Sequence, residues 1–257
     1  DFNEKDDFQI MAYTSVPSVT QKGNELTLRI PPTFDGYVTA FTDYAMKHNG
    51  KKLGMGGATH EYAKIWAGMM KKQWTAEGGE VVADNPMDYN KSADFYTGVS
   101  RIISENPDVM FVGGASEPTG LVVQQARQLG FQGSFIVMDQ AKLDEVAEGA
   151  IVVVPLSVYE TKPAQDFIKR YKAKYNKMPG SEAAYNYLAM HALIEAMDEQ
   201  NTTEAKALRA GVPEALKSMD DSKNPYEVKE VDAGGGFVTE TTLAVVEDGK
   251  IVQKPIE

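Results

Sequence analysis

The sequence predicts an α/β protein of two domains, and three observations lead to this class. From Lys52 onward, short apolar runs alternate with segments of helical periodicity, as in a parallel sheet covered by helices. After residue 155 the alternation stops and three helical segments follow one another. The length of 257 residues also favours two domains over one, because a single core rarely grows that large.

The strands and helices of residues 36–155 read as one doubly wound domain. Helices are predicted between the strands by an apolar stripe from Tyr62 to Trp74, by a second from Phe95 to Ile103, and by a third that begins at Ser116 and stops at Gly130. A short helix is predicted over 141–147. The predicted strands are KLGMGG (52–57), GEVVAD (79–84), PDVMFV (107–112), GSFIVM (133–138) and AIVVVP (150–155).

The remaining residues predict a second domain that is incomplete. Helices are expected at Pro163–Asn176 and Ser181–Gln200, and a third, interrupted by Gly211 and Pro213, from residue 203 to 219. One expected strand, FQIMAY at 8–13, cannot cover the apolar faces of three helices. We therefore assign 1–35 and 156–226 to a partial first lobe and expect βα units to precede it. The second lobe is assigned 36–155 and 227–257, ending in a hairpin at Asp248-Gly249.

Composition excludes several classes of function. The formal net charge of −11 disfavours nucleic acid and acidic lipid surfaces as partners, and no apolar run approaches the about 20 residues of a membrane span. The chain has no cysteine and its three histidines are scattered, so the sequence gives no sign of a metal site. We expect no cofactor, no nucleic-acid partner and no direct insertion into a membrane.

The candidate site lies at the carboxyl ends of the strands, where open parallel sheets bind ligands. Tyr62 follows the strand 52–57, Ala115 and Ser116 follow the strand 107–112, and Asp139 follows the strand 133–138. These three loops are expected to share one rim. The segment Tyr13-Thr14-Ser15 ends the strand of the other lobe, and residues 30–36 look like a crossing between the lobes.

Each candidate also has a purely structural interpretation. Asp139 and Ser116 suit the N-caps of the helices that follow them, Thr14 and Ser15 suit a hydroxyl turn before Pro17, and Tyr62 suits the core. Their shared location is what favours a ligand site. Enzyme motifs are weaker: GMGGAT is a partial match to a dinucleotide-binding loop, with no Walker A lysine and no G-x-S-x-G elbow.

Three long stretches resemble one family, the type I periplasmic solute-binding proteins of the leucine/isoleucine/valine class. They are AYTSVPSVTQKGNELTLRIPPT, DFYTGVSRIISENPDVMFVGGASEPTGLVVQQARQLGFQGSFIVMD and AEGAIVVVPLSVYETKPAQDFIKRYKAKYNKMPGSEAAYNYLAMHALIEAM. The resemblance covers nearly the whole chain. It implies two doubly wound parallel-sheet lobes joined by a hinge of three crossings, with the first lobe incomplete here.

The resemblance also implies roles for the candidate residues. The strand-end hydroxyls and amides of Tyr13, Thr14 and Ser15 would hold a ligand carboxylate, and Asp139 would pair with an α-ammonium group. Tyr62 would pack on the ligand.

Ala115 or Ser116 would supply a further contact, although relatives carry an aromatic residue there and this chain carries small ones. That departure leaves the preferred ligand side chain open. A second carboxylate-binding loop of the family would precede Asp1, so this chain alone would bind weakly or not at all.

The function expected on this basis is the extracytoplasmic binding component of an ABC uptake system, which takes an amino acid or similar small polar ligand by hinge closure and catalyses no reaction. Its partners would be that ligand and a membrane permease, and its location periplasmic or extracellular. Two alternatives stay open: a nucleotide-binding α/β enzyme or regulator, and a sensory or aromatic-acid-binding relative of the same fold.

Overall fold

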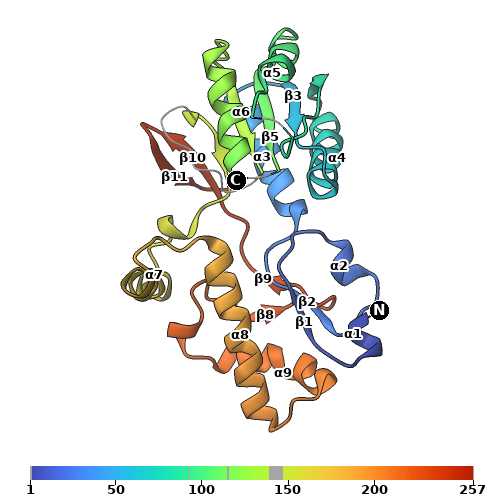
Figure 1. The fold of residues 1–257 in the computed structure, drawn as a ribbon, viewed down its shortest axis with the longest axis vertical. Coiled ribbons are helices and arrows are strands. Elements are labelled where there is room, and N and C mark those ends of the chain that lie inside the picture. The colour runs from blue at the N-terminus through green and yellow to red at the C-terminus, as the bar shows by residue number, and fades with distance from the viewer. Residues whose placement is uncertain (1, 92, 115, 139–146, 257) are drawn as a thin grey trace. The chain divides into compact units, whose positions relative to one another are not determined.

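The structure is a computed structural model that describes residues 2–91, 93–114, 116–138 and 147–256 (Figure 1). Its contacts divide the chain into two units. The first unit comprises residues 1–33 and 155–240, and the second unit comprises residues 34–154 and 241–257. The chain therefore passes between the units three times, at 33/34, 154/155 and 240/241. The helix expected over 141–147 falls, except for its last residue, outside the described residues.

The second unit is built on a seven-stranded sheet in the order β11-β10-β7-β6-β5-β3-β4. β4, β3, β5, β6 and β7 pair in parallel, and the hairpin β10–β11 adds two antiparallel strands at the β7 side. The bounds of these strands are β3 (Lys52–Gly57), β4 (Glu80–Asp84), β5 (Val109–Gly113), β6 (Ser134–Val137), β7 (Ile151–Val152), β10 (Leu243–Glu247) and β11 (Lys250–Lys254).

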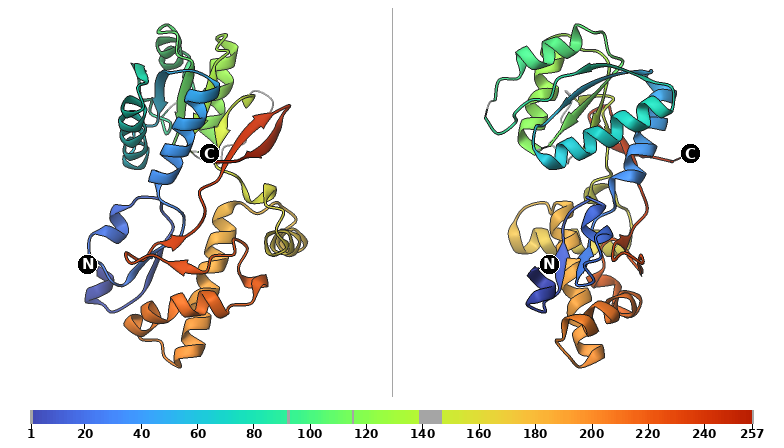
Figure 2. Two further views of the ribbon diagram at one scale, coloured as in Figure 1. Left: turned by 180° about the vertical axis from the view of Figure 1, so that it is seen from behind. Right: turned by 90° about the vertical axis from the view of Figure 1, so that its right-hand side faces the viewer.

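Helices cover both faces of this sheet (Figure 2). α3 (Phe34–His48) and α4 (Glu61–Ala76) pack together on one face, while α5 (Tyr96–Ile103) and α6 (Ser116–Gln128) pack together on the other. β5 is buried along its whole length because it has helices above and below. This arrangement agrees with the strand and helix alternation predicted from the sequence, which missed only α3 and extended β7 too far.

The core under α3 and α4 is aromatic. Trp66, only 2% exposed, lies with its ring centroid 4.7 Å from that of Phe34 and 6.3 Å from that of Phe111. Phe34 begins α3 and is buried, so the last residues of the expected 30–36 crossing, 34–36, are helical. Aromatic burial of this kind contributes several kcal/mol per side chain and anchors α3 and α4 to the sheet.

The first unit contains two short sheets and the three long helices. β1 (Ile10–Ala12) and β2 (Thr27–Arg29) pair in parallel, and β8 (Glu230–Val231) and β9 (Phe237–Val238) pair antiparallel. The helices of this unit are α1 (Phe2–Lys5), α2 (Ser18–Gln21), α7 (Lys162–Tyr175), α8 (Ser181–Gln200) and α9 (Ala205–Ser218), with 3-10 turns at Leu156–Val158 and Asp221–Lys223.

Three expectations for the first unit were wrong. β2 is a second strand before Val228, where the sequence predicted only one. Residues 227–240 belong to the first unit rather than to the second lobe, because Val228 and Phe237 are buried in the same cluster as Leu28 and the inner face of α8. α9 also runs without a break through Gly211 and Pro213.

The C-terminal hairpin was predicted from Asp248-Gly249, and this prediction is confirmed. β10 and β11 pair from Leu243 opposite Lys254 to Glu247 opposite Lys250, which leaves two residues in the turn. Asp248 has φ 51° and Gly249 has φ 67°. A two-residue turn with both φ values positive matches the twist of the strands, and Asp-Gly adopts it at low cost.

Candidate ligand-binding site

The parallel strands of the second unit have a topological switch point between β3 and β5. The chain runs from β3 outward to β4 and then returns past β3 to β5, β6 and β7. Gly57 at the end of β3 pairs with Gly113 at the end of β5, so the two loops that follow begin side by side. Ligands of open α/β sheets bind at this position, beyond the carboxyl ends of the strands.

His60 ties the two loops of the switch point together. It is the N-cap of α4, and its Nδ1 accepts the backbone N–H of Ala63 at 3.3 Å. The proton must therefore be on Nε2, which lies 2.5 Å from the carbonyl oxygen of Gly114 and donates to it. Because one imidazole caps α4 and holds the β5 loop, the start of α4 and the end of β5 form one rigid edge.

Tyr89 makes a further hydrogen-bonded link between β3 and β5 at the same edge. Its hydroxyl donates to the carbonyl of Gly56 at 2.7 Å and accepts the backbone N–H of Gly113 at 3.3 Å. The side chain is 3% exposed. One buried hydroxyl therefore links the last residues of β3 to those of β5.

Replacing Tyr89 with phenylalanine is expected to lower the free energy of unfolding by about 1–3 kcal/mol, because it leaves buried polar groups of Gly56 and Gly113 without this partner. Urea unfolding of the two proteins measures the difference. Tyr96→Phe is the matched control, since Tyr96 is 41% exposed, and it should change stability by less than about 0.5 kcal/mol. Equal effects of the two variants would contradict this role for Tyr89.

The structure brings part of the predicted site to this edge. Tyr62 lies in the first turn of α4, half-buried, with its ring edge-on to Phe34 at 5.1 Å and 6.2 Å from the His60 ring. Ser116 begins α6, two positions after Gly114 in the chain. Ala115 and Asp139 lie outside the described residues; Asp139 follows β6 by two positions.

The other predicted residues lie in the first unit, directly after β1. The Thr14 hydroxyl accepts the backbone N–H of Val16 at 3.2 Å, which is the hydroxyl turn that the sequence offered as the structural alternative. This bond uses an acceptor position of the oxygen and leaves the hydroxyl proton for another partner. Ser15 is half-buried, and Tyr13 is 44% exposed.

The sequence missed an aromatic group beside this segment. The Tyr13 ring lies 6.3 Å from that of Tyr185 on α8, which stacks on Tyr226 with centroids 4.0 Å apart. Tyr159 meets Tyr226 edge-on at 5.3 Å. Tyr185 lies on α8 and is buried in the core, and nothing local in the sequence shows that it also borders the β1 loop.

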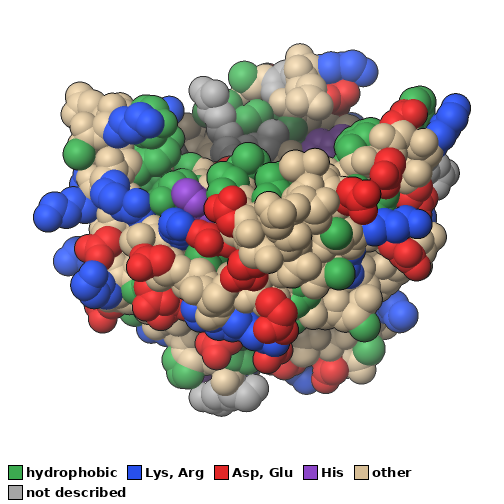
Figure 3. Space-filling view, turned by 90° about the horizontal axis from the view of Figure 1, so that it is seen from below, with side chains coloured by type: hydrophobic (Ala, Val, Ile, Leu, Met, Phe, Trp, Pro, Cys, Tyr) green, Lys and Arg blue, Asp and Glu red, His purple; other side chains and the backbone are tan. Residues whose placement is uncertain are grey.

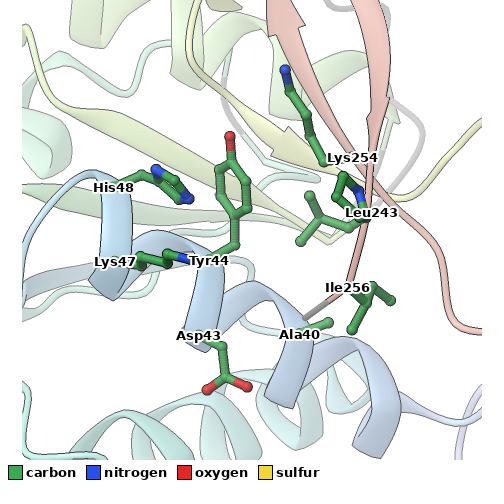
Figure 4. A pocket seen from close by; sticks show the side chains of 9 residues that line it. Ala40, Asp43, Tyr44, Lys47, His48, Leu243, Lys254 and Ile256 are labelled. Atoms are coloured by element: carbon green, nitrogen blue, oxygen red, sulfur yellow. The ribbon is translucent and has the colours of Figure 1, made fainter.

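A separate cavity of about 440 Å³ lies in the second unit between α3 and the chain end of the β10–β11 hairpin (Figure 4). Ala40, Leu243 and Ile256 give it apolar walls, and the rings of Tyr44 and His48 lie 4.3 Å apart beside it. None of the predicted site residues that the structure describes lines it. It is therefore distinct from the switch-point edge.

Two searches of the described residues bear on other kinds of site. No cluster of three or more His, Asp or Glu side chains in that part of the chain has the arrangement of a metal site. No helix found there combines the length and apolar character that a bilayer span requires. Acidic and basic side chains are interspersed on the face shown in Figure 3, without a large patch of one sign.

Comparison with known proteins identifies the family. A family model described as periplasmic binding protein matches residues 9–250. The chain belongs to the periplasmic binding protein family. This agrees with the resemblance found in the sequence and with an α/β fold built on a largely parallel sheet.

Individual relatives are distant. A Leu/Ile/Val-binding protein of Citrobacter freundii is 23% identical over 212 residues, which is 79% of this chain and 58% of that protein. A leucine binding protein from Thermotoga maritima has a TM-score of 0.81 at 22% identity, covering 99% of this chain and 74% of that one. A solute binding protein from R. palustris in complex with 4-hydroxybenzoate has a TM-score of 0.76 at 19% identity, covering 96% and 69%.

The two solved structures show that this chain shares their fold. The chain spans 58% of the length of the curated relative, so it corresponds to a part of that protein.

Proposed function

We propose that this chain is part of the substrate-binding component of an ABC transporter and that it binds an amino acid or a similar small polar ligand by closure of its two units. The observation that carries the proposal is membership in the periplasmic binding protein family over residues 9–250. Relatives named for binding leucine, isoleucine and valine support an amino acid as the ligand. The component catalyses no reaction and works without a cofactor.

The two ends of the ligand would be held by different units. Asp139, after β6, pairs with the α-ammonium group, and the segment Tyr13-Thr14-Ser15, after β1, holds the carboxylate. A charge-assisted contact in a closed site is stronger and more selective than a neutral hydrogen bond. β5 and β6 pair in parallel, so the loops after them begin at the same edge of the sheet, and this supports the assignment of Asp139.

Tyr62 packs against the ligand body, and the loop at Ala115 and Ser116 supplies a further contact. The ring of Tyr62 is half-buried and lies edge-on to the ring of Phe34, a contact that helps to fix its position. This chain carries Ala and Ser at positions 115 and 116, where relatives carry an aromatic residue, and that difference leaves the preferred ligand side chain open. The partner for release is a membrane permease, and the location is periplasmic or extracellular.

A second candidate is an aromatic acid without an amine. The R. palustris relative bound to 4-hydroxybenzoate supports it, as does the tyrosine group of Tyr13, Tyr185 and Tyr226 beside the β1 loop. Aromatic rings stack on one another with gains of about 0.5–1.5 kcal/mol per pair. The carboxylate would keep its contacts at Thr14 and Ser15, whereas Asp139 would have no cationic partner.

Isothermal titration calorimetry tests the proposal on the natural full-length protein that contains these residues. We expect saturable binding of at least one of leucine, isoleucine and valine, and no binding of ATP or NAD. Binding of 4-hydroxybenzoate alone would select the second candidate. Absence of binding across a full panel of amino acids and aromatic acids, together with binding of a nucleotide, would contradict the proposed function.

A further inference from the structure

Arg29 is a buried charge that the proposed ligand site does not use. It ends β2, and its side chain is 4% exposed. Within the described parts of the chain it is the only Asp, Glu, Lys or Arg residue in the buried class. Burying a guanidinium is unfavourable unless hydrogen bonds and an opposite charge replace the water it loses, so its surroundings must supply specific partners.

Two separate segments supply those partners. The Nη1 group donates to the carbonyl oxygen of Pro31, two residues further along the chain. The Nη2 group lies 3.5 Å from Oδ2 of Asp232, in the turn between β8 and β9. One planar group with donors in a fixed fork therefore holds two backbone segments in a set relation.

The turn that begins at Asp232 has a shape that accommodates the Arg29 guanidinium. Oδ1 of Asp232 accepts the backbone N–H of Gly236 at 2.9 Å, and the Arg29 backbone N–H donates to the Gly235 carbonyl at 2.8 Å. A Cβ atom on Gly236 would collide with the Arg29 guanidinium. Gly235 has φ +98°, and a Cβ there would lie 2.9 Å from the carbonyl oxygen of Thr27. The turn accepts only glycine at the two places where it meets β2.

Both segments lead directly out of the first unit. Pro31 is two residues before the passage at 33/34. β9 follows the Asp232 turn at once, and its last residue, Val238, is two residues before Glu240 and the passage at 240/241. Within the first unit, Arg29 thus joins the two segments that lead into two of the three connections to the second unit.

We propose that Arg29 is the anchor of the hinge: a positioning residue that makes the passages at 33/34 and 240/241 bend as one connection. This rests on the proposed function, in which the units close over a ligand. A coupled pair of connections restricts the ways in which the units move apart, so a larger share of molecules reaches the closed, ligand-retaining arrangement. Asp232 fixes the guanidinium from the β9 side.

Three variants separate this role from simple stability. Asp232→Asn removes the carboxylate charge and keeps an Oδ1 acceptor for the Gly236 N–H, and Asp232 is 46% exposed, so folding is preserved. Arg29→Lys keeps the charge but has a point-like head group that cannot bridge both segments. Glu214→Gln removes an exposed ion pair with Lys217 in the same unit and is the matched control.

The readout is the distance between the units. Residues 1–257 contain no cysteine, so Met190→Cys in α8 and Lys72→Cys in α4 give two exposed sites for spin labels, and any cysteine elsewhere in the full-length protein is replaced by serine. We expect Asp232→Asn and Arg29→Lys to broaden the ligand-free distance distribution and to weaken ligand binding about 3- to 10-fold, while Glu214→Gln changes neither. The urea midpoint of each ligand-free variant is measured in parallel.

Distributions as narrow as that of the unsubstituted protein, with only the urea midpoint lowered, would overturn the proposal and make Arg29 a purely structural residue. The ligand-free distribution can be measured even if no ligand is found. Failure of the proposed function is therefore seen in the calorimetry of the unsubstituted protein, and failure of the hinge anchor is seen in the distances.

Discussion

Replacing Asp139 with asparagine is expected to weaken binding of an α-amino acid by about 30-fold or more, because removal of one partner of an enclosed, hydrogen-bonded charge pair costs about 2–5 kcal/mol. The side chain keeps its size and loses only its charge, so the fold should be unaffected. Calorimetry on the natural full-length protein measures the change in Kd.

The matched control is Asp84→Asn. Asp84 stands at the carboxyl end of β4, at the same edge of the sheet, where it pairs with Lys71 at 2.7 Å. Exposed pairs of this kind contribute little, so this variant should change Kd less than about 3-fold. An Asp139→Asn protein that binds the amino acid as tightly as the unsubstituted one would remove Asp139 from the site. A ligand without an amine should bind both variants equally well.

Replacing Trp66 with alanine is expected to lower the stability of the second unit by about 3–5 kcal/mol, the usual cost of deleting a large buried aromatic side chain. Trp66 is 2% exposed and packs against Phe34, Tyr37, Phe41 and Phe111. Urea unfolding followed by the fluorescence of Trp74 measures the effect, since the variant leaves Trp74 as the sole tryptophan, and it is buried in the same unit.

Trp66→Phe separates packing from polar effects. The buried indole Nε1 of Trp66 has no hydrogen-bond partner among the described residues, so phenylalanine loses volume but no hydrogen bond. We expect a cost below about 2 kcal/mol for this variant. If Trp66→Ala were no more destabilising than Trp66→Phe, the aromatic cluster under α3 and α4 would not carry the stability assigned to it.

The sequence predicted most of the second unit because its strands and helices differ strongly in periodicity. The bounds of α8 and the Asp248-Gly249 hairpin were predicted for local reasons, namely a long apolar face and two residues that tolerate positive φ. α3 was missed although Phe34, Val38, Phe41 and Ala45 are spaced along one buried helical face. Pro31 and Pro32 lie just before it and are typical of an extended crossing, so the local pattern does not mark the start of a helix.

The first unit was less predictable because its strands are short and its pairing is not local. β2 has three residues that are all buried, one of them Arg29, so it shows neither alternation nor an apolar run. β8 and β9 have two residues each, and the burial of Val228 and Phe237 among distant side chains assigns residues 227–240 to this unit. Such contacts cannot be predicted from residues that are neighbours in the sequence.

The site was predictable to the level of a sheet edge and no further. The order of the parallel strands places the loops after β3 and β5 together, as the alternating pattern implied. The bonds from His60 to Gly114 and from Tyr89 to Gly56 stiffen that edge, but each joins loops or strands far apart in sequence. The ligand contacts of the candidate residues remain a proposal.

A crystal structure of the natural full-length protein with its bound amino acid would show whether both ends of the ligand are held as proposed. We expect an ammonium group within hydrogen-bond distance of the Asp139 carboxylate and a carboxylate group against the backbone and hydroxyls of Thr14 and Ser15. A ligand bound elsewhere, for example in the cavity beside Tyr44 and His48, or a ligand that touches only one of these two segments, would contradict it.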